Sequence, residues 1–327
     1  MKAVIPNGSG GVEVLTIKEF PRPEPGPNQI LVKVYAAALN YADTMQRRGE
    51  YPLRPGQIEI LGVEIAGTVE SFGPEVTGFQ KGQRIFGLVE GGGYAEYCLM
   101  EQQMAVTIPD HWSFTEAAAV AEVFITAGES LFELGNLVKG QSVLIHAGGS
   151  GVGSAAVQMA HHIGATVFCT VGSPEKAQKV KSLGADIIID YKKQDFVKEI
   201  LSHTGNEGVE VLLDFFGGSY FPRNLSVLKA RGCLVLIGLF DGHTCEIDLV
   251  KILLNRLQIK GIAMRNRPLQ EKAQINQRFK QRYLPLLVDG KIKPVIHSVY
   301  PLEKVAFAHQ EMEERRNVGK IILTVHP

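Results

Sequence analysis

A regular alternation of short apolar runs and helix-length segments in the middle of the chain constrains the fold more than any other sequence feature. The runs have strand length and occupy residues 142–146, 166–171, 187–189, 209–213 and 233–237. Strands that alternate with helices form parallel βαβ units, with helices on both faces of one sheet. Residues 123–264 are therefore predicted to form an α/β domain built on a doubly wound parallel sheet.

The first third of the chain is predicted to be β-rich instead. Strand-like runs at 12–17, 30–34, 66–70, 84–88 and 94–99 are separated by glycine and proline. The segment PRPEPGPN at 21–28 cannot lie inside a regular element. We expect residues 1–122 to form a barrel-like domain. Residues 265–327, with a helical stretch at 270–288 and a strand at 320–325, are expected to complete it.

A glycine-rich loop joins the first strand of the α/β domain to a helix expected at 154–163. Its sequence is AGGSGVG, residues 147–153, and its glycines do not follow the G-x-G-x-x-G spacing. The context is more informative, because a strand, a tight turn and a helix N-terminus together present backbone N–H groups to a phosphate. We interpret the loop as the pyrophosphate site of a nucleotide cofactor.

The end of the next strand indicates which nucleotide is bound. Sites for NAD usually place an acidic residue there to bind the adenine ribose, whereas this chain has Gly172. Ser173 and Pro174 suit the start of a helix, and Lys176 adds positive charge. This pattern favours NADPH over NADH. An ordinary capped helix with a solvated lysine is the alternative, which Glu175 keeps open.

Composition excludes several classes of function. The chain has 34 Lys plus Arg and 34 Asp plus Glu, so no net positive charge attracts nucleic acid or an anionic membrane. No run approaches the ~20 apolar residues that span a bilayer. The cysteines, at 98, 169, 233 and 245, form no CxxC pair. We expect four buried, reduced thiols and a cytoplasmic protein.

Five stretches carry a family resemblance that covers nearly the whole chain. They are AALNYADTMQRRGEYP at 37–52, ILGVEIAGTVESFGPEVTGFQKGQRI at 60–85, EAAAVAEVFITA at 116–127, VLIHAGGSGVGSAAVQMA at 143–160 and NVGKIIL at 317–323. With these motifs the chain resembles the zinc-free quinone oxidoreductases of the medium-chain dehydrogenase/reductase superfamily. Residues 47–51, 190–196 and 217–220 add features of its NADPH-dependent members.

The resemblance implies a GroES-like catalytic domain, a Rossmann NADPH-binding domain, a quinone bound in the cleft between them, and a homodimer joined through edge strands of the Rossmann domains. It also implies the residues that contact the cofactor. Ser150, Gly151 and Val152 would meet the pyrophosphate, and Ser173, Lys176 and Tyr191 would surround the 2′-phosphate and ribose. Asn40, Thr126, Gly238 and Phe240 would lie near the nicotinamide, and Asn317 and Lys320 would close the cofactor site.

Zinc enzymes of the superfamily have a cysteine in the segment where Asn40 to Asp43 stand here, and His-Glu where this chain has Val63-Glu64. We therefore expect no metal, because thiolate and imidazole ligands are missing. A quinone accepts hydride or single electrons without a Lewis acid. Asn40, Asp43 and Tyr51 are the catalytic candidates. Asn40 would donate its amide, Tyr51 would offer a ring and a hydroxyl, and Asp43 would orient Tyr51 or relay a proton.

Each candidate also has a structural interpretation: Asn40 as a turn residue, Tyr51 as packing, and Asp43 as a carboxylate at a helix start. Two other functions stay open. Reduction of an enone, alkenal or enoyl thioester would use Tyr51 or Tyr41 as proton donor. A non-catalytic, crystallin-like NADPH-binding protein would need no such donor. RNA binding is not expected, because no basic and aromatic motif is present.

Overall fold

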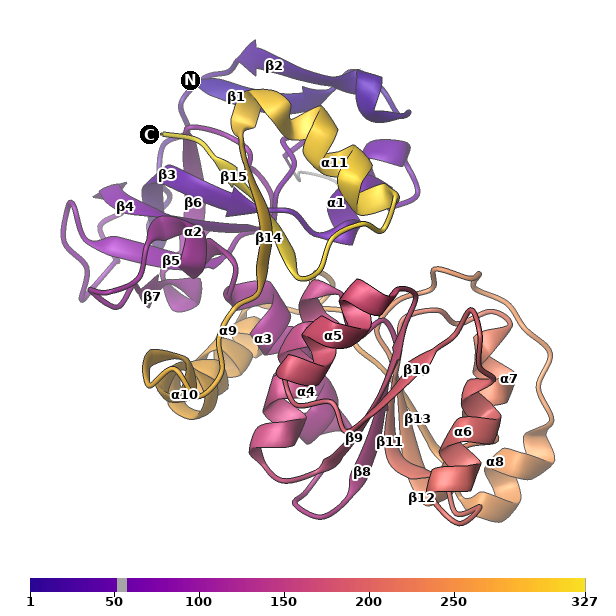
Figure 1. Ribbon diagram of the computed structural model, residues 1–327. Helices are drawn as coiled ribbons and strands as arrows, with labels where there is room; N and C mark the ends of the chain where they lie inside the picture. The colour runs from indigo at the N-terminus through magenta and orange to yellow at the C-terminus, as the bar shows by residue number, and fades with distance from the viewer. Residues whose placement is uncertain (52–57, 327) are drawn as a thin grey trace. The chain divides into compact units, whose positions relative to one another are not determined.

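The computed structural model describes residues 1–51 and 58–326, and it divides into two compact units (Figure 1). Unit 1 comprises Met1–Glu122, Leu269–Lys280 and Pro294–Pro327; unit 2 comprises Val123–Pro268 and Gln281–Lys293. Residues 265–268 differ from the expectation that 265–327 completes the first domain, and so do residues 281–293. The latter belong to unit 2 because the side-chain amide of Gln158 exchanges hydrogen bonds of 2.9 and 3.0 Å with the backbone of Lys293.

Unit 2 is built on a six-stranded parallel sheet, which confirms the predicted α/β architecture. Its strands are β8 (Ser142–Ile145), β9 (Thr166–Val171), β10 (Ile187–Asp190), β11 (Val209–Asp214), β12 (Leu228–Leu236) and β13 (Gln258–Gly261). They lie in the order β10-β9-β8-β11-β12-β13, and every pairing is parallel. This is the Rossmann order, in which the chain changes direction between the first and fourth strands, and ligands bind beyond the carboxyl ends there.

Helices cover both faces of this sheet, which explains why its inner strands are rich in apolar residues. They are α3 (Ala121–Gly128), the π-helical η3 (Glu129–Leu134), α4 (Gly151–His162), α5 (Pro174–Ser182), α6 (Phe196–His203), α7 (Tyr220–Leu225) and α8 (Leu249–Asn255). Leu144, Phe168 and Leu234 are among the buried residues of its core. Helix α4 begins at Gly151, three residues before the predicted start, because Ser150 caps it.

Unit 1 is organised around β3 (Gln29–Ala38), which pairs with three strands. The other strands of its seven-stranded sheet are β4 (Glu64–Phe72), β5 (Arg84–Leu88), β6 (Tyr97–Glu101), β7 (Val106–Thr107), β14 (Ile296–Pro301) and β15 (Lys320–Thr324). A separate two-stranded sheet, β1 (Lys2–Pro6) and β2 (Leu15–Glu19), is linked to the segment before β6 by an antiparallel bridge between Ala3 and Ala95. Strand β15 pairs with β3, so the end of the chain completes the unit, as its apolar pattern predicts.

Two strand predictions in unit 1 are wrong in part. Residues Val12–Val14 form the 3₁₀ turn η1 before β2, and β6 begins at Tyr97 instead of residue 94. The helices are α1 (Tyr41–Arg48), α2 (Phe114–Ala118), α9 (Leu269–Arg278) and α11 (Val305–Glu313), with the short turns η2 (Gln102–Met104) and η5 (Leu302–Lys304). The helical stretch expected at 270–288 is α9, a π-helical segment η4 (Phe279–Tyr283) and α10 (Leu284–Val288).

Candidate functional site

The glycine loop after β8 has the geometry of a phosphate site. Ala147 adopts a left-handed backbone with φ of 48°, and the Ser150 hydroxyl caps α4 by accepting the N–H of Gly153 at 3.0 Å. A side chain at Gly153 would collide with the carbonyl oxygen of Ala147. The first intrahelical hydrogen bond runs from the Ser154 N–H to the Ser150 carbonyl at 2.9 Å, so helix geometry leaves the N–H groups of Gly151 and Val152 for a ligand.

Three predicted residues gather beside this loop. Ser173 caps α5, and its hydroxyl accepts the N–H of Lys176 at 3.3 Å. The methylene stem of Lys176 lies over Gly149, where an added Cβ would be 3.2 Å from it. The hydroxyl of Tyr191 fills the space that a side chain at Gly172 would need. The Tyr191 phenol therefore occupies the space in which an NAD-binding site would have its acidic side chain, and Lys176 lies near the same loop.

The remaining residues predicted in unit 2 follow other elements. Gly238 lies just beyond β12, and its N–H donates to the Asp214 carbonyl at 3.3 Å. Phe240 meets Phe216 edge-on at 6.2 Å. Thr126 is buried on α3. Because β8, β9, β10 and β12 run parallel, the predicted residues that follow them share the carboxyl edge of one sheet.

In unit 1, Asn40 is the centre of a buried polar cluster. Its Nδ2 donates to Glu64 Oε1 at 2.9 Å, and its Oδ1 accepts from Lys320 Nζ at 2.7 Å. The Lys320 ammonium also contacts Glu64 Oε1 and the Leu39 carbonyl, each at 2.6 Å. Glu64 Oε2 accepts the backbone N–H of Glu122 at 3.0 Å. Asn40 is 8% exposed and Lys320 is 3% exposed. We call Asn40, Glu64 and Lys320 the Asn40 cluster.

Asp43 supports the same residue from the other side. Its Oδ2 accepts the backbone N–H of Asn40 and the hydroxyl of Tyr94, both at 2.8 Å. The bond from the Asn40 N–H belongs to a capping box with Asn40 as the N-cap of α1, so the helix-start role of Asp43 is observed directly. Burial raises the pKa of Asp43 to about 6, although both hydrogen bonds and Lys320 lower it. No partner of its Oδ1 lies among the described residues.

The far end of α1 is fixed by a buried arginine. Arg47 Nε donates to the Gly10 carbonyl at 3.1 Å, and its Nη2 pairs with Glu313 at 2.5 Å. The ring nitrogen Nδ1 of His309 lies 3.4 Å from Arg47 Nη1. Burial, with the charges of Arg47 and Arg48 as lesser causes, lowers the pKa of His309 to about 3, so the ring is neutral beside the guanidinium.

Tyr51 and Asn317 occupy less constrained positions. Tyr51 is half-buried and follows Gly49, the left-handed C-cap of α1. Pro52, the last residue of the first family motif, lies outside the described residues. The amide of Asn317 donates to the Gly319 carbonyl at 2.8 Å and closes the turn before β15. The structure thus joins Asn40 directly to Asp43 and to Lys320.

Sequence reasoning missed Tyr94 and the ion pair of Lys320. A signal for the second was present, because a lysine that opens the apolar strand KIILT is buried only when a carboxylate compensates it. The expectation of four buried thiols is wrong for Cys245, which is exposed, whereas the other three cysteines are buried. Within residues 1–51 and 58–326, no three His, Cys, Asp or Glu side chains converge as metal ligands. No helix there has the length and apolarity to cross a membrane.

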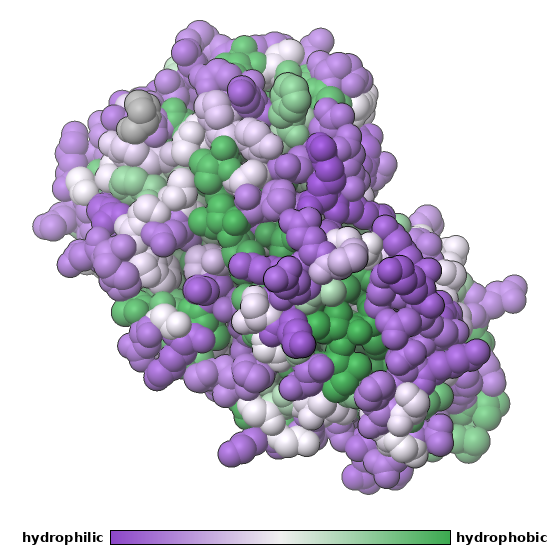
Figure 2. Space-filling model, in the orientation of Figure 1, coloured by the Kyte–Doolittle hydropathy of each residue, from purple (hydrophilic) through white to green (hydrophobic). Residues whose placement is uncertain are grey.

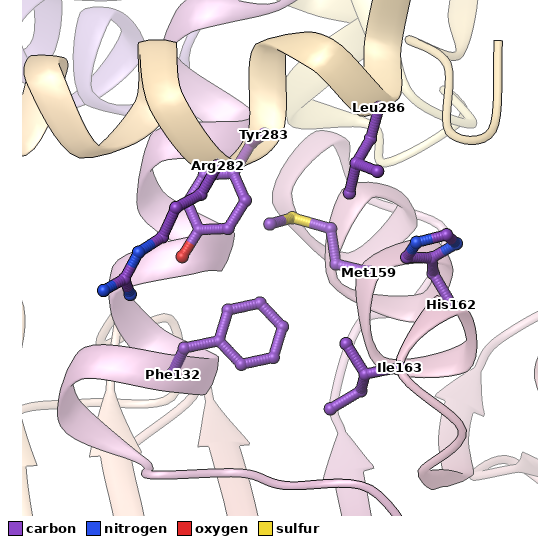
Figure 3. A pocket seen from close by; sticks show the side chains of 7 residues that line it. All are labelled: Phe132, Met159, His162, Ile163, Arg282, Tyr283 and Leu286. Atoms are coloured by element: carbon purple, nitrogen blue, oxygen red, sulfur yellow. The ribbon is translucent and has the colours of Figure 1, made fainter. Parts of the chain in front are cut away.

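One pocket lies away from these residues, within unit 2 (Figure 3). It has a volume of about 410 Å³ and is lined by Phe132, Met159, His162, Ile163, Arg282, Tyr283 and Leu286. Most of these side chains are apolar, as Figure 3 shows, and come from η3, the end of α4 and the segment that includes η4 and α10. The glycine loop lies at the opposite end of α4, so this pocket is not part of the phosphate site.

Comparison with known families agrees with both units. Residues 26–110 match the family described as alcohol dehydrogenase GroES-like domain, and residues 151–286 match the zinc-binding dehydrogenase family. The fold therefore combines a GroES-like domain with a Rossmann domain. The chain belongs to the medium-chain dehydrogenase/reductase superfamily and is a homologue of its quinone oxidoreductases.

Two curated relatives match almost all of the chain. The human synaptic vesicle membrane protein VAT-1 homolog is 33% identical over 344 residues, which cover 100% of this chain and 87% of the relative. The quinone oxidoreductase of Rattus norvegicus is 31% identical over 326 residues, which cover 99% of this chain and 97% of the relative.

Two solved structures are also similar. The Escherichia coli quinone oxidoreductase complexed with NADPH has a TM-score of 0.92 and 28% identity, and covers 99% of this chain and 100% of its own. CurK enoyl reductase has a TM-score of 0.86 and 29% identity, and covers 99% of this chain and 98% of its own.

Proposed function

We propose that this oxidoreductase homologue is an NADPH-dependent quinone reductase. The observation that carries the proposal is the group formed by Lys176, Tyr191 and the glycine loop at the carboxyl edge of the Rossmann sheet. This group offers helix N-terminal N–H groups for a pyrophosphate and a lysine for a 2′-phosphate. A quinone oxidoreductase relative and a neighbour complexed with NADPH add support.

The residues would hold NADPH as follows. The N–H groups of Gly151 and Val152 and the hydroxyl of Ser150 bind the pyrophosphate. Lys176, Ser173 and Tyr191 bind the 2′-phosphate and ribose, and Thr126, Gly238 and Phe240 line the nicotinamide site. When bound, the cofactor supplies a hydride or single electrons to the acceptor. Asn317 is proposed to act through its turn and not by direct contact, because its amide already bonds to Gly319.

On the substrate side, Asn40 and Tyr51 are the proposed catalytic residues. A quinone gains negative charge on its oxygens as it is reduced, and a fixed donor beside it stabilises that charge. The amide of Asn40 and the phenol of Tyr51 can donate in this way, whereas Asp43 positions Asn40 through the capping box.

Zinc independence is part of the proposal. Where the zinc enzymes of the superfamily carry ligands, this chain has no cysteine in the segment Asn40 to Asp43, and it has the aliphatic Val63 in place of a histidine. The ammonium of Lys320 already occupies the oxygens of Asn40 and Glu64, and its positive charge opposes a divalent cation there. Quinone reduction needs no Lewis acid, so this residue set suits the reaction.

The alternative is reduction of an activated C=C bond, which the similarity to CurK enoyl reductase favours. That reaction needs a proton donor at the α-carbon, and Tyr51 or Tyr41 is the residue to test. Turnover of small enones or enoyl thioesters without turnover of quinones would establish the alternative.

We also propose a homodimer. β13 is an edge strand of the sheet, with β12 as its partner. The neighbouring helix α8 exposes large apolar side chains, including Leu253 at 74% and Leu254 at 72%. Apolar surface is visible at the lower right edge of Figure 2, where α8 lies in Figure 1. Pairing of two β13 strands across a twofold axis would continue the sheet and cover both helices. The proposed compartment is the cytoplasm, because the thiols are unpaired.

The test is oxidation of NADPH by 1,2-naphthoquinone in the presence of EDTA, with NADH as the cofactor control and an enone as the substrate control. Quinone-dependent oxidation that survives EDTA and prefers NADPH supports the proposal. Tyr51→Phe and Asn40→Ala should then lower kcat while the Kd for NADPH changes little. If NADPH binds tightly and no acceptor is reduced, the quinone assignment fails and a non-catalytic binding role takes its place.

A further inference from the structure

The Asn40 cluster determines which way the Asn40 amide points. An ammonium can only donate hydrogen bonds, and an ionised carboxylate can only accept them. Lys320 faces Oδ1 at 2.7 Å and Glu64 faces Nδ2 at 2.9 Å. If the amide turned over, its NH₂ would face the ammonium and its oxygen would face the carboxylate. The ion pair therefore rejects the flipped amide on both sides.

Both members of this ion pair are also held by further hydrogen bonds. The three hydrogens of the Lys320 ammonium match three acceptors, namely the Leu39 carbonyl, Asn40 Oδ1 and Glu64 Oε1. Both oxygens of Glu64 accept, because Oε2 holds the N–H of Glu122 at 3.0 Å. The ammonium has no hydrogen left with which to turn away from Asn40, and both oxygens of Glu64 are engaged, so the pair is held in place.

One hydrogen of the Asn40 amide is held only weakly. Nδ2 has two hydrogens, of which one goes to Glu64 at 2.9 Å. The other has a contact of 3.4 Å to the Ala38 carbonyl, which is long for an N–H···O bond. Because Oδ1 accepts from an ammonium, the amide is polarised and its remaining N–H is a stronger donor.

Stability alone does not explain such a pair, since the desolvation of two buried charges offsets much of their attraction. We propose that Lys320 and Glu64 are positioning residues that lock the Asn40 amide in one orientation, so that its weakly held N–H serves the oxygen of the reacting group. This proposal rests on the proposed function. It changes the role of Lys320 from a residue that closes the cofactor site to one that acts through Asn40.

The first test uses the free protein and so does not depend on any activity. The side-chain NH₂ signals of Asn40, assigned with Asn40→Ala, should be widely separated and protected from exchange with solvent. Lys320→Met should speed that exchange by about tenfold or more, because a charge-assisted hydrogen bond is lost. Lys272→Met is the matched control, since Lys272 is 7% exposed in the same unit and pairs with Glu90. It should leave the Asn40 signals in place.

A second variant removes both charges, so that no buried carboxylate is left alone if Lys320→Met folds poorly. In Lys320→Met/Glu64→Gln, the carbonyl of the new glutamine can still accept the Glu122 N–H, which leaves its NH₂ facing Asn40. The amide of Asn40 should then turn over and direct its oxygen to that NH₂. A crystal structure or the NMR shifts of this folded variant would show the turn.

The kinetic test is a double-mutant cycle with the quinone. Lys320→Met should lower kcat by about tenfold with a smaller change in KM, and in an Asn40→Ala background its further effect should be less than about twofold. Lys320→Arg, which keeps a charged donor, should recover part of kcat. The proposal is overturned if the Asn40 signals are unchanged in Lys320→Met, or if the loss of kcat is the same with and without Asn40. If the wild type reduces no quinone, the proposed function fails. The NMR test still decides whether Lys320 and Glu64 hold the Asn40 amide in one orientation.

Discussion

Asp43→Asn should stabilise unit 1 at neutral pH, and the gain should depend on pH in a defined way. Burial is the main reason that the Asp43 pKa is about 6 in the folded protein, against an ordinary value of 3.8. Below pH 3.8 the carboxyl is protonated in the folded and unfolded states, so its ionisation costs nothing. As the pH rises from about 4 to 7, the unfolded state loses this proton first and the folded state becomes less stable. The full penalty is about 3 kcal/mol, from about two pKa units at 1.36 kcal/mol each.

Asparagine can keep the two hydrogen bonds of Asp43 without carrying this penalty, because its single carbonyl oxygen can accept from both Asn40 and Tyr94. The free energy of unfolding, measured by urea titration, should therefore rise relative to wild type by about 3 kcal/mol between pH 4 and pH 7.5. Trp112 is the only tryptophan and is buried in unit 1, so its fluorescence reports on this unit. Asp110→Asn, at an exposed position in the same unit, is the matched control. A difference that is constant with pH, or that falls as pH rises, would refute the reasoning.

Three further predictions concern unit 2. Gly172→Asp should weaken NADPH binding without strengthening NADH binding, because the new side chain collides with the Tyr191 hydroxyl. Gly172→Asp/Tyr191→Ala should shift the ratio of the two Kd values, measured by fluorescence titration, toward NADH. Ala147→Gly should raise the thermal midpoint, because relief of the left-handed backbone at Ala147 contributes up to about 1 kcal/mol; an unchanged or lower midpoint contradicts this. Leu253→Asp/Leu254→Asp should convert the proposed dimer to a monomer in sedimentation velocity, whereas Val138→Asp, at another exposed apolar position, should not.

The sequence predicts five of the six strands of unit 2 because their signal is local. The inner strands are largely buried, and β9 has the predicted bounds, whereas the exposed edge strand β13, with the sequence QIKG, carries no such signal and is not predicted. The short strands of unit 1 are less certain, since one face is polar and turns are frequent. Val12–Val14 alternates like a strand, yet it forms a 3₁₀ turn before β2. Such boundaries depend on pairing with distant segments, which the local pattern does not contain.

Long-range contacts separate the predictable part of the site from the rest. Ser150, Gly151 and Val152 are adjacent in sequence, and the strand, loop and helix around them are sufficient to identify their role. Lys320 is 280 residues from Asn40 in the chain, and its contact with Asn40 exists because β15 pairs with β3. A family motif can mark Lys320 as part of a site, but only the register of two strands shows that its ammonium faces an amide and not a ligand.

Asn40 is held at two independent places, which bears on how the site works. Asp43, which also accepts the Tyr94 hydroxyl, fixes its backbone through the capping box, and Lys320 and Glu64 hold its side chain. A residue that only caps a helix needs the first of these restraints and no ion pair. The second restraint places a buried ion pair around one neutral amide, and burial of an ion pair brings little net stability. Preorganisation of a hydrogen-bond donor is the benefit that accounts for both restraints together.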